Sequence, residues 1–227
     1  MPETPIRAVL FDLDGTLLDT LADIAAAMNT VLERHGFSPH SVDAYRSMVG
    51  SGLRKLAERA AGADSGDVSA QTVSVLAEGL REEYSRNPVV HTRAYPGVPE
   101  LLDRLERQGT PKAVLSNKAD ALVQHIVQAL LNGWEFWSVS GLRDGTPAKP
   151  DPTSALESAR ALGAPAREVL YLGDSDVDME TARRAGMVPV GAAWGFRGPE
   201  ELRAAGAVEI IDAPGDLLSL IDGANDS

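Results

Sequence analysis

Two aspartates one residue apart, Asp12 and Asp14, directly follow a short apolar run near the start of the chain. The run, Ile6–Phe11, is predicted to form a buried strand, which places both carboxylates where the strand ends. Acids this close repel each other, so a fold keeps them together with a compensating cation or a shared proton. Oxygen ligands suit a hard ion such as Mg²⁺, and a carboxylate can also be the nucleophile in aspartyl-phosphate chemistry. The simpler alternative is a strand end with two solvated aspartates in a turn.

Other apolar runs along the chain predict the sheet that would carry these acids. They occur at 113–115, 169–172, 188–190 and 208–211, with a weaker pattern at 136–139. Stretches with apolar residues at helical spacing separate most of these runs. The alternation of strand and helix indicates βαβ units, and therefore an α/β fold with a parallel sheet.

About a hundred residues lie between the first two predicted strands, far more than a crossover connection needs. Within them, apolar residues recur at helical spacing in three stretches. Residues 18–88 are therefore predicted to form an inserted helical bundle, and 1–17 with 89–227 the α/β core. Thr20 and Asp23 have the spacing of a capping box at the start of the first inserted helix.

Polar residues follow two more predicted strands in the way that Asp12 and Asp14 follow the first. The carboxyl ends of parallel strands share one edge of a sheet, and ligands of open α/β sheets bind there. Lys149, in the loop before a later predicted helix, is the remaining candidate for a site at this edge. The residues expected to meet at this edge are Asp12, Asp14, Ser116, Asn117, Lys149, Asp174 and Asp178.

The acidic members of this set suit phosphoryl transfer. Asp12 would attack phosphorus, and Asp14 would protonate the leaving oxygen and later take a proton from water. Asp174 would hold Mg²⁺ together with Asp12 and the backbone carbonyl of Asp14. Asp178 would act through a metal-bound water or would orient Lys149. Taken singly, Asp174 and Asp178 also fit the acids that commonly begin a helix.

The remaining members would supply positive charge and hydrogen-bond donors. Ser116 and Asn117 would donate to phosphate oxygens, and Lys149 would place a positive charge near the nucleophile. Each has a structural alternative, because Ser and Asn often cap helices and a lone lysine is usually a surface residue. Lys118, which directly follows Asn117, is expected to be solvated.

The order Asp12-x-Asp14-Gly15-Thr16, Ser116, Lys149-Pro150 and Gly173-Asp174-x-x-x-Asp178 resembles the four signatures of the haloacid dehalogenase superfamily. The resemblance covers nearly the whole chain. It implies a Rossmann-like, three-layer core with a parallel sheet, a mobile α-helical cap of the family's first cap class, and Mg²⁺-dependent phosphoaspartate chemistry. It also implies that Gly15 and Thr16 help to bind the phosphate.

Within that superfamily the chain looks most like bacterial phosphoglycolate phosphatases. The resemblance is carried by the segments Asp14–Thr20, Tyr95–Val98 and Ser116–Lys118, and by Gly50-x-Gly52 in the inserted bundle. It implies that Arg54, close behind these glycines, is a candidate to bind a substrate carboxylate. The alternative for Arg54 is a solvated residue at a helix start.

Several other activities fit the same residues. They are a sugar-phosphate phosphatase, a pyrophosphatase, a nucleotidase and a β-phosphoglucomutase-like mutase; a phosphonatase would need the one lysine of the inserted bundle, Lys55. From a different class, the chain could be a non-catalytic protein that binds a phosphorylated ligand or accepts a phosphoryl group.

The net charge of −12 argues against non-specific binding to nucleic acid or to an anionic membrane. Cysteine is absent, which excludes disulfides, thiolate metal sites and cysteine nucleophiles. The N-terminus lacks the pattern of a signal peptide, so a cytoplasmic protein is expected. We expect a small phosphorylated metabolite as the substrate, and a monomer or homodimer.

Overall fold

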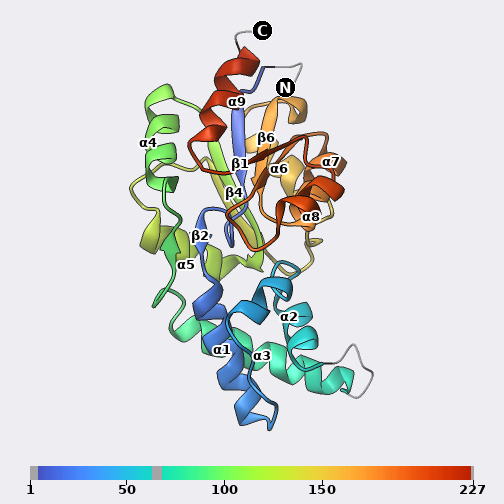
Figure 1. Cartoon of the computed structure of the whole chain (residues 1–227). Coiled ribbons are helices and arrows are strands. Elements are labelled where there is room, and N and C mark those ends of the chain that lie inside the picture. Colours follow the sequence, from blue (N-terminus) through green and yellow to red (C-terminus); the bar gives the residue numbers. More distant parts are fainter. Residues whose placement is uncertain (1–4, 63–67, 226–227) are drawn as a thin grey trace. The chain divides into compact units, whose positions relative to one another are not determined.

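The computed structural model describes residues 5–62 and 68–225 (Figure 1). Contacts divide the chain into two compact units, one made of Met1–Asp19 and Ala94–Ser227, the other of Thr20–Arg93. We call the first the core unit and the second the helical unit. The boundaries expected from the sequence lie two and five residues earlier, at 17/18 and 88/89.

A six-stranded parallel sheet forms the centre of the core unit, in the order β5-β4-β1-β6-β7-β8. The α/β fold with a parallel sheet, predicted from the sequence, is thereby confirmed. A separate two-stranded sheet, β2–β3, lies where the chain leaves and re-enters the core unit. The strands are β1 (Ala8–Phe11), β2 (Leu18–Asp19), β3 (Arg93–Ala94), β4 (Lys112–Ala119), β5 (Ser138–Leu142), β6 (Val169–Gly173), β7 (Val188–Ala192) and β8 (Glu209–Ile211).

Strand β1 lies between β4 and β6, and its register decides which residues meet at the sheet edge. Phe11, its last residue, is opposite Val114 on one side and Leu172 on the other. All four residues of β1 are buried, as expected for a parallel strand covered on both faces. The segments that follow these three strands therefore emerge side by side at the carboxyl edge.

Helices cover both faces of the sheet (Figure 1). Alternate residues of β1, β4 and β6, such as Leu10, Leu115 and Tyr171, pack against α6 and α7 on one face. Because parallel crossovers are right-handed, the connections through α4 and α5 run over the other face. The helices of the core unit are α4 (Val98–Gln108), α5 (Asp120–Leu130), α6 (Thr153–Ala161), α7 (Asp176–Ala185), α8 (Pro199–Ala204) and α9 (Asp216–Asn225).

The helical unit contains α1 (Leu21–Arg34), α2 (Leu53–Ala60) and α3 (Ala70–Arg86), with α3 packed against both of the others. The predicted capping box at α1 is wrong, because Thr20 makes no side-chain cap bond. The buried Asp23 carboxylate instead accepts the backbone N–H groups of His91 and Thr92 and the Thr92 hydroxyl. Asp23 thus ties the first turn of α1 to the end of the unit.

Strands β5 and β4 differ most from the sequence prediction. The strand expected at 136–139 begins two residues later and ends at Leu142. Strand β4 continues through Ser116–Lys118 to Ala119, with an irregular register against β5 after Leu115. Among the described residues, no helix is long and apolar enough to cross a membrane.

Candidate active site

The carboxylates of Asp12, Asp174 and Asp178 meet at the carboxyl edge of the sheet. One oxygen from each lies within 4.8 Å of the others, and all three residues are buried. Asp12 follows β1, whereas Asp174 follows the adjacent strand β6 and Asp178 lies in the first turn of α7. The structure thus brings together acids that are separated by more than 160 residues in the sequence.

The Lys149 ammonium lies on one side of this cluster and is buried with it. It donates to Asp12 Oδ1 at 2.6 Å, to Asp178 Oδ1 at 2.7 Å and to the Leu115 carbonyl at 3.2 Å. Burial opposes the charged form of Lys149, but the two carboxylates outweigh it and raise the pKa of Lys149 well above its usual value. Lys149 is therefore a fixed positive charge beside Asp12, and its alternative as a surface lysine is excluded.

Both oxygens of Asp178 are used by neighbouring protein groups. Oδ1 accepts from Lys149 and, at 3.3 Å, from the Tyr171 hydroxyl. Oδ2 accepts from the Ser175 backbone N–H at 3.1 Å and from its hydroxyl at 2.5 Å, which completes a capping box at α7. Gly173 makes room for Asp178, since a Cβ at 173 would lie 2.3 Å from the Asp178 Cβ. This arrangement fits Asp178 best for orienting Lys149.

Asp174 is held by a segment that sequence reasoning missed, Trp194–Phe196. The backbone N–H of Phe196 donates to Asp174 Oδ2 at 2.7 Å, and the Trp194 indole N–H donates to the Thr16 carbonyl at 3.0 Å. A Cβ on Gly195 would lie 2.2 Å from the Asp174 Cβ, so only glycine fits there. The segment follows the carboxyl end of β7, and the strand-end rule applied to that strand could have found it.

Burial and like charge act together on the acids. Burial, with the charge of Asp178, raises the pKa of Asp12 to about 7 despite Lys149. Burial, with the charges of Asp12 and Asp178, also raises the pKa of Asp174 well above its usual value. If all three acids ionise, their three negative charges are offset by the single positive charge of Lys149, which contacts Asp12 and Asp178, and two negative charges remain. A divalent cation bound by Asp12 and Asp174 would balance that excess, so the donor set fits a metal ion.

Asp14 lies beside the cluster and is bound by two side chains from β4. The Lys118 ammonium donates to its Oδ1 at 2.5 Å, and the Ser116 hydroxyl donates to its Oδ2 at 3.3 Å. The Lys118 side chain is only 4% exposed, so the expectation that it is solvated is wrong. Side chains alternate along a strand, which explains why Ser116 and Lys118 share one side.

Asn117, between them, faces the other way and pairs with the backbone of Lys149. Its amide nitrogen donates to the Lys149 carbonyl at 3.1 Å, and its oxygen accepts the Lys149 N–H at 2.8 Å. Both ends of the amide are therefore engaged in holding the lysine-bearing loop. A second use as a phosphate donor would require this pair to open.

Gly15 and Thr16 lie in the turn after β1. Gly15 has a φ of +90°, and a Cβ there would lie 2.1 Å from Asp174 Oδ2, so its lack of a side chain lets the two segments approach. The Thr16 hydroxyl is buried without a hydrogen-bond partner among the described residues. Arg54 belongs to the helical unit, where its guanidinium donates to the Ser74 hydroxyl at 2.8 Å.

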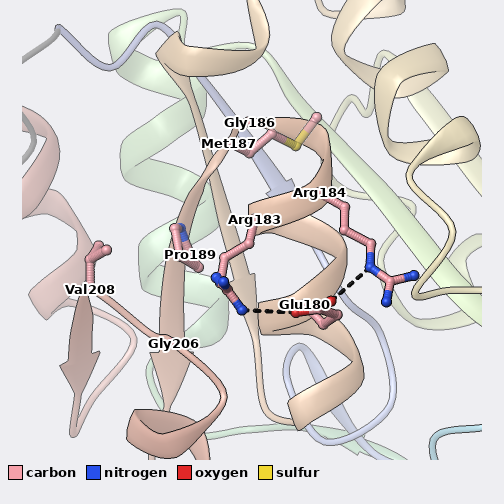
Figure 2. Close-up of a pocket in the computed structure, with 8 residues that line it drawn as sticks. All are labelled: Glu180, Arg183, Arg184, Gly186, Met187, Pro189, Gly206 and Val208. Carbon is pink, nitrogen blue, oxygen red and sulfur yellow. Dashed lines mark hydrogen bonds and ion pairs between the residues drawn. The ribbon is translucent and has the colours of Figure 1, made fainter.

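A cavity of about 460 Å³ lies elsewhere in the core unit, around the end of α7 and the start of β7 (Figure 2). Arg183 and Arg184 line it, but both are ion-paired to the single carboxylate of Glu180. Asp12 follows the carboxyl end of β1, whereas the cavity lies at the start of the parallel strand β7, which is at the opposite edge of the sheet. The cavity is therefore separate from the acidic cluster around Asp12.

A buried aspartate pair, a fixed lysine and a hydroxyl donor lie together at the switch point of a doubly wound sheet, where open α/β sheets bind their ligands. The profile described as haloacid dehalogenase-like hydrolase matches residues 9–192. The chain belongs to this family.

Relatives with similar sequences cover the chain almost completely. A phosphoglycolate phosphatase of Aquifex aeolicus is 34% identical, over 96% of this chain and 97% of its own length. An N-acetylmuramic acid 6-phosphate phosphatase of Pseudomonas aeruginosa is 32% identical, over 99% of this chain and 98% of its own. Together with the family, these relatives make the protein a phosphoric monoester hydrolase.

Solved structures agree with this assignment. A protein from Lactobacillus delbrueckii subsp. bulgaricus superimposes with a TM-score of 0.90 at 30% identity, over 96% of this chain and 99% of its own. A predicted phosphoglycolate phosphatase of Haemophilus somnus gives a TM-score of 0.85 at 27% identity, over 95% and 97%. The expected membership of the haloacid dehalogenase superfamily is confirmed.

Proposed function

We propose that the protein hydrolyses small phosphate monoesters with Mg²⁺, through an aspartyl phosphate on Asp12, and that 2-phosphoglycolate is its substrate. The observation that carries the proposal is the buried cluster in which Asp12 contacts the Lys149 ammonium and lies beside Asp174. This arrangement leaves Asp12 with a fixed cation on one side and a partner for a metal ion on the other.

The chain's own residues supply both half-reactions. An Asp12 oxygen attacks phosphorus, the bond from phosphorus to the leaving oxygen breaks, and Asp14 gives its proton to that oxygen. Water then attacks the phosphorus of the aspartyl phosphate, Asp14 takes a proton from the water, and the bond to Asp12 breaks to release inorganic phosphate. Lys149 and the Ser116 hydroxyl stabilise the charge on the phosphoryl oxygens.

Mg²⁺, bound by Asp12, Asp174 and the backbone carbonyl of Asp14, would reduce the repulsion between the anionic nucleophile and the anionic phosphate. We assign Asp178 to orienting Lys149 and Asn117 to fixing its backbone, because their polar atoms are engaged there. Gly15 and Thr16 would shape the turn that receives the phosphate.

The substrate assignment rests on the relatives and on Arg54. Phosphoglycolate phosphatases of Aquifex aeolicus and of several Pseudomonas species are 32–34% identical to this chain. 2-Phosphoglycolate carries a carboxylate besides its phosphate, and the Arg54 guanidinium suits a carboxylate. Arg54→Gln should therefore raise KM for 2-phosphoglycolate more than for phosphate esters without a carboxylate.

A sugar 6-phosphate is the second candidate substrate, because the Pseudomonas aeruginosa N-acetylmuramic acid 6-phosphate phosphatase is nearly as similar. The test is phosphate release from a panel that contains 2-phosphoglycolate, sugar phosphates, nucleotides and pyrophosphate, with and without Mg²⁺. We expect the highest kcat/KM for 2-phosphoglycolate, and loss of activity in EDTA and in Asp12→Asn. Release that survives Asp12→Asn would contradict the nucleophile, and no release from any substrate would contradict the function.

A further inference from the structure

Asp14 must aim its carboxyl group at two different atoms during turnover, the leaving oxygen and then the attacking water. In the structure two neighbours hold it, Ser116 at one oxygen and Lys118 at the other. Ser116 is also the proposed donor to the phosphate, and its hydroxyl has a single hydrogen to donate. The two duties of Ser116 therefore exclude each other.

The Ser116 hydroxyl is already oriented by Lys118. Its oxygen accepts the backbone N–H of Lys118 at 3.1 Å, which leaves its hydrogen for either Asp14 or the phosphate. When the hydrogen turns to the phosphate, Asp14 Oδ2 becomes available to the leaving oxygen. Asp14 Oδ1 keeps its bond to the Lys118 ammonium throughout.

We propose that Lys118 is a positioning residue, which holds the Asp14 carboxyl group in place while Ser116 transfers its hydrogen bond from Asp14 to the phosphate. Burial supports this role, because the side chains of Lys118 and Asp14 are 4% and 11% exposed. A charged hydrogen bond in such surroundings is stronger and better directed than a surface ion pair. The proposal rests on the proposed function, and it adds a lysine to the acid–base step.

The proposal predicts a dependence on the leaving group. An alkyl phosphate needs a proton on its leaving oxygen, whereas p-nitrophenolate leaves without one, so only the alkyl ester needs Asp14 in the first half-reaction. In Lys118→Met, single-turnover release of alcohol from an alkyl phosphate should fall about tenfold or more. The burst of p-nitrophenolate from p-nitrophenyl phosphate should keep its rate, and a slow steady state should follow, because the attack of water still needs Asp14.

Lys112→Met is the matched control. Lys112 lies on the same strand, is buried to a similar degree and is ion-paired with Glu106, away from the acids. It should leave the ratio of alkyl to aryl rates unchanged, which separates the effect of Lys118 from the general loss of a buried lysine on β4. Lys118→Arg, which keeps a cation, should recover part of the alkyl rate.

The outcomes separate this proposal from the proposed function. Equal loss of alkyl and aryl rates in Lys118→Met would overturn the positioning role, and so would a selective loss of the alkyl rate in Lys112→Met as large as in Lys118→Met. A rise in KM for all esters at unchanged kcat would mean that Lys118 binds substrate instead, and would also overturn it. If the wild-type protein releases neither alcohol nor p-nitrophenolate with Mg²⁺ present, the proposed function itself has failed.

Discussion

Asp12→Asn should abolish catalysis and yet stabilise the protein when metal is removed. Burial and the charge of Asp178 raise the pKa of Asp12 from 3.8 to about 7. The shift is about three units, which corresponds to about 4 kcal/mol of differential stability between the protonated and ionised forms. Asparagine resembles the protonated acid in shape and charge, so it avoids the cost of ionising Asp12 in the folded state.

The direction in which the stability changes with pH follows from proton binding. Because the pKa of Asp12 is higher in the folded state, the folded protein holds this proton at pH values where the unfolded chain has lost it. The stability of the metal-free wild type should therefore fall as the pH rises from about 4 to about 7, and stay low above that. The stability of Asp12→Asn lacks this fall. Its free energy of unfolding should therefore equal that of the metal-free wild type at pH 4 and exceed it by about 4 kcal/mol at pH 8.

Urea denaturation in EDTA at several pH values measures these free energies of unfolding. Saturating Mg²⁺ at pH 8 should stabilise the wild type much more than Asp12→Asn, because the ion binds the folded state at that carboxylate. Asp212→Asn, at an exposed acid, is the control and should show no such pattern. Equal or lower stability of Asp12→Asn at pH 8 in EDTA would refute the electrostatic argument.

Three further substitutions test other parts of the account. Gly195→Ala places a methyl group against Asp174 and should weaken Mg²⁺ activation about tenfold or more in a metal titration, whereas Gly198→Ala, with open space around it, should not. Asn117→Ala removes both bonds to the Lys149 backbone and should lower the free energy of unfolding by about 1–3 kcal/mol; an increase in KM at unchanged stability would instead assign Asn117 to the phosphate. Asp23→Ala leaves the N–H groups of residues 91 and 92 without their acceptor, and should speed their hydrogen exchange. Unchanged exchange would contradict the role of Asp23 in tying α1 to the end of the helical unit.

The sequence was sufficient to predict groups that follow the ends of buried strands. Asp12 and Asp174 each follow an apolar run, and parallel pairing of β1 with β6 brings them together. Lys149 was predicted from its place in the loop before α6. These predictions succeed because strand direction and burial are encoded locally, in runs of apolar residues.

The parts that could not be predicted depend on contacts between distant segments. The burial of Lys118 depends on Asp14, which lies in the segment that follows β1, and a lysine in isolation is usually exposed. The Phe196 bond to Asp174 uses a backbone N–H, which leaves no mark in the side-chain sequence. Strand β4 was predicted to end before Asn117, whereas the strand continues and turns the Asn117 amide toward Lys149.

The most direct test of the central claim is to identify the residue that carries the phosphoryl group. Wild-type protein, Mg²⁺ and a substrate with a labelled phosphoryl group are mixed, quenched in acid within the first turnover, and digested for peptide mapping. The account predicts a transient label on the peptide that contains Asp12, absent from Asp12→Asn. Turnover without any protein-bound label, or a label on another residue, would contradict it.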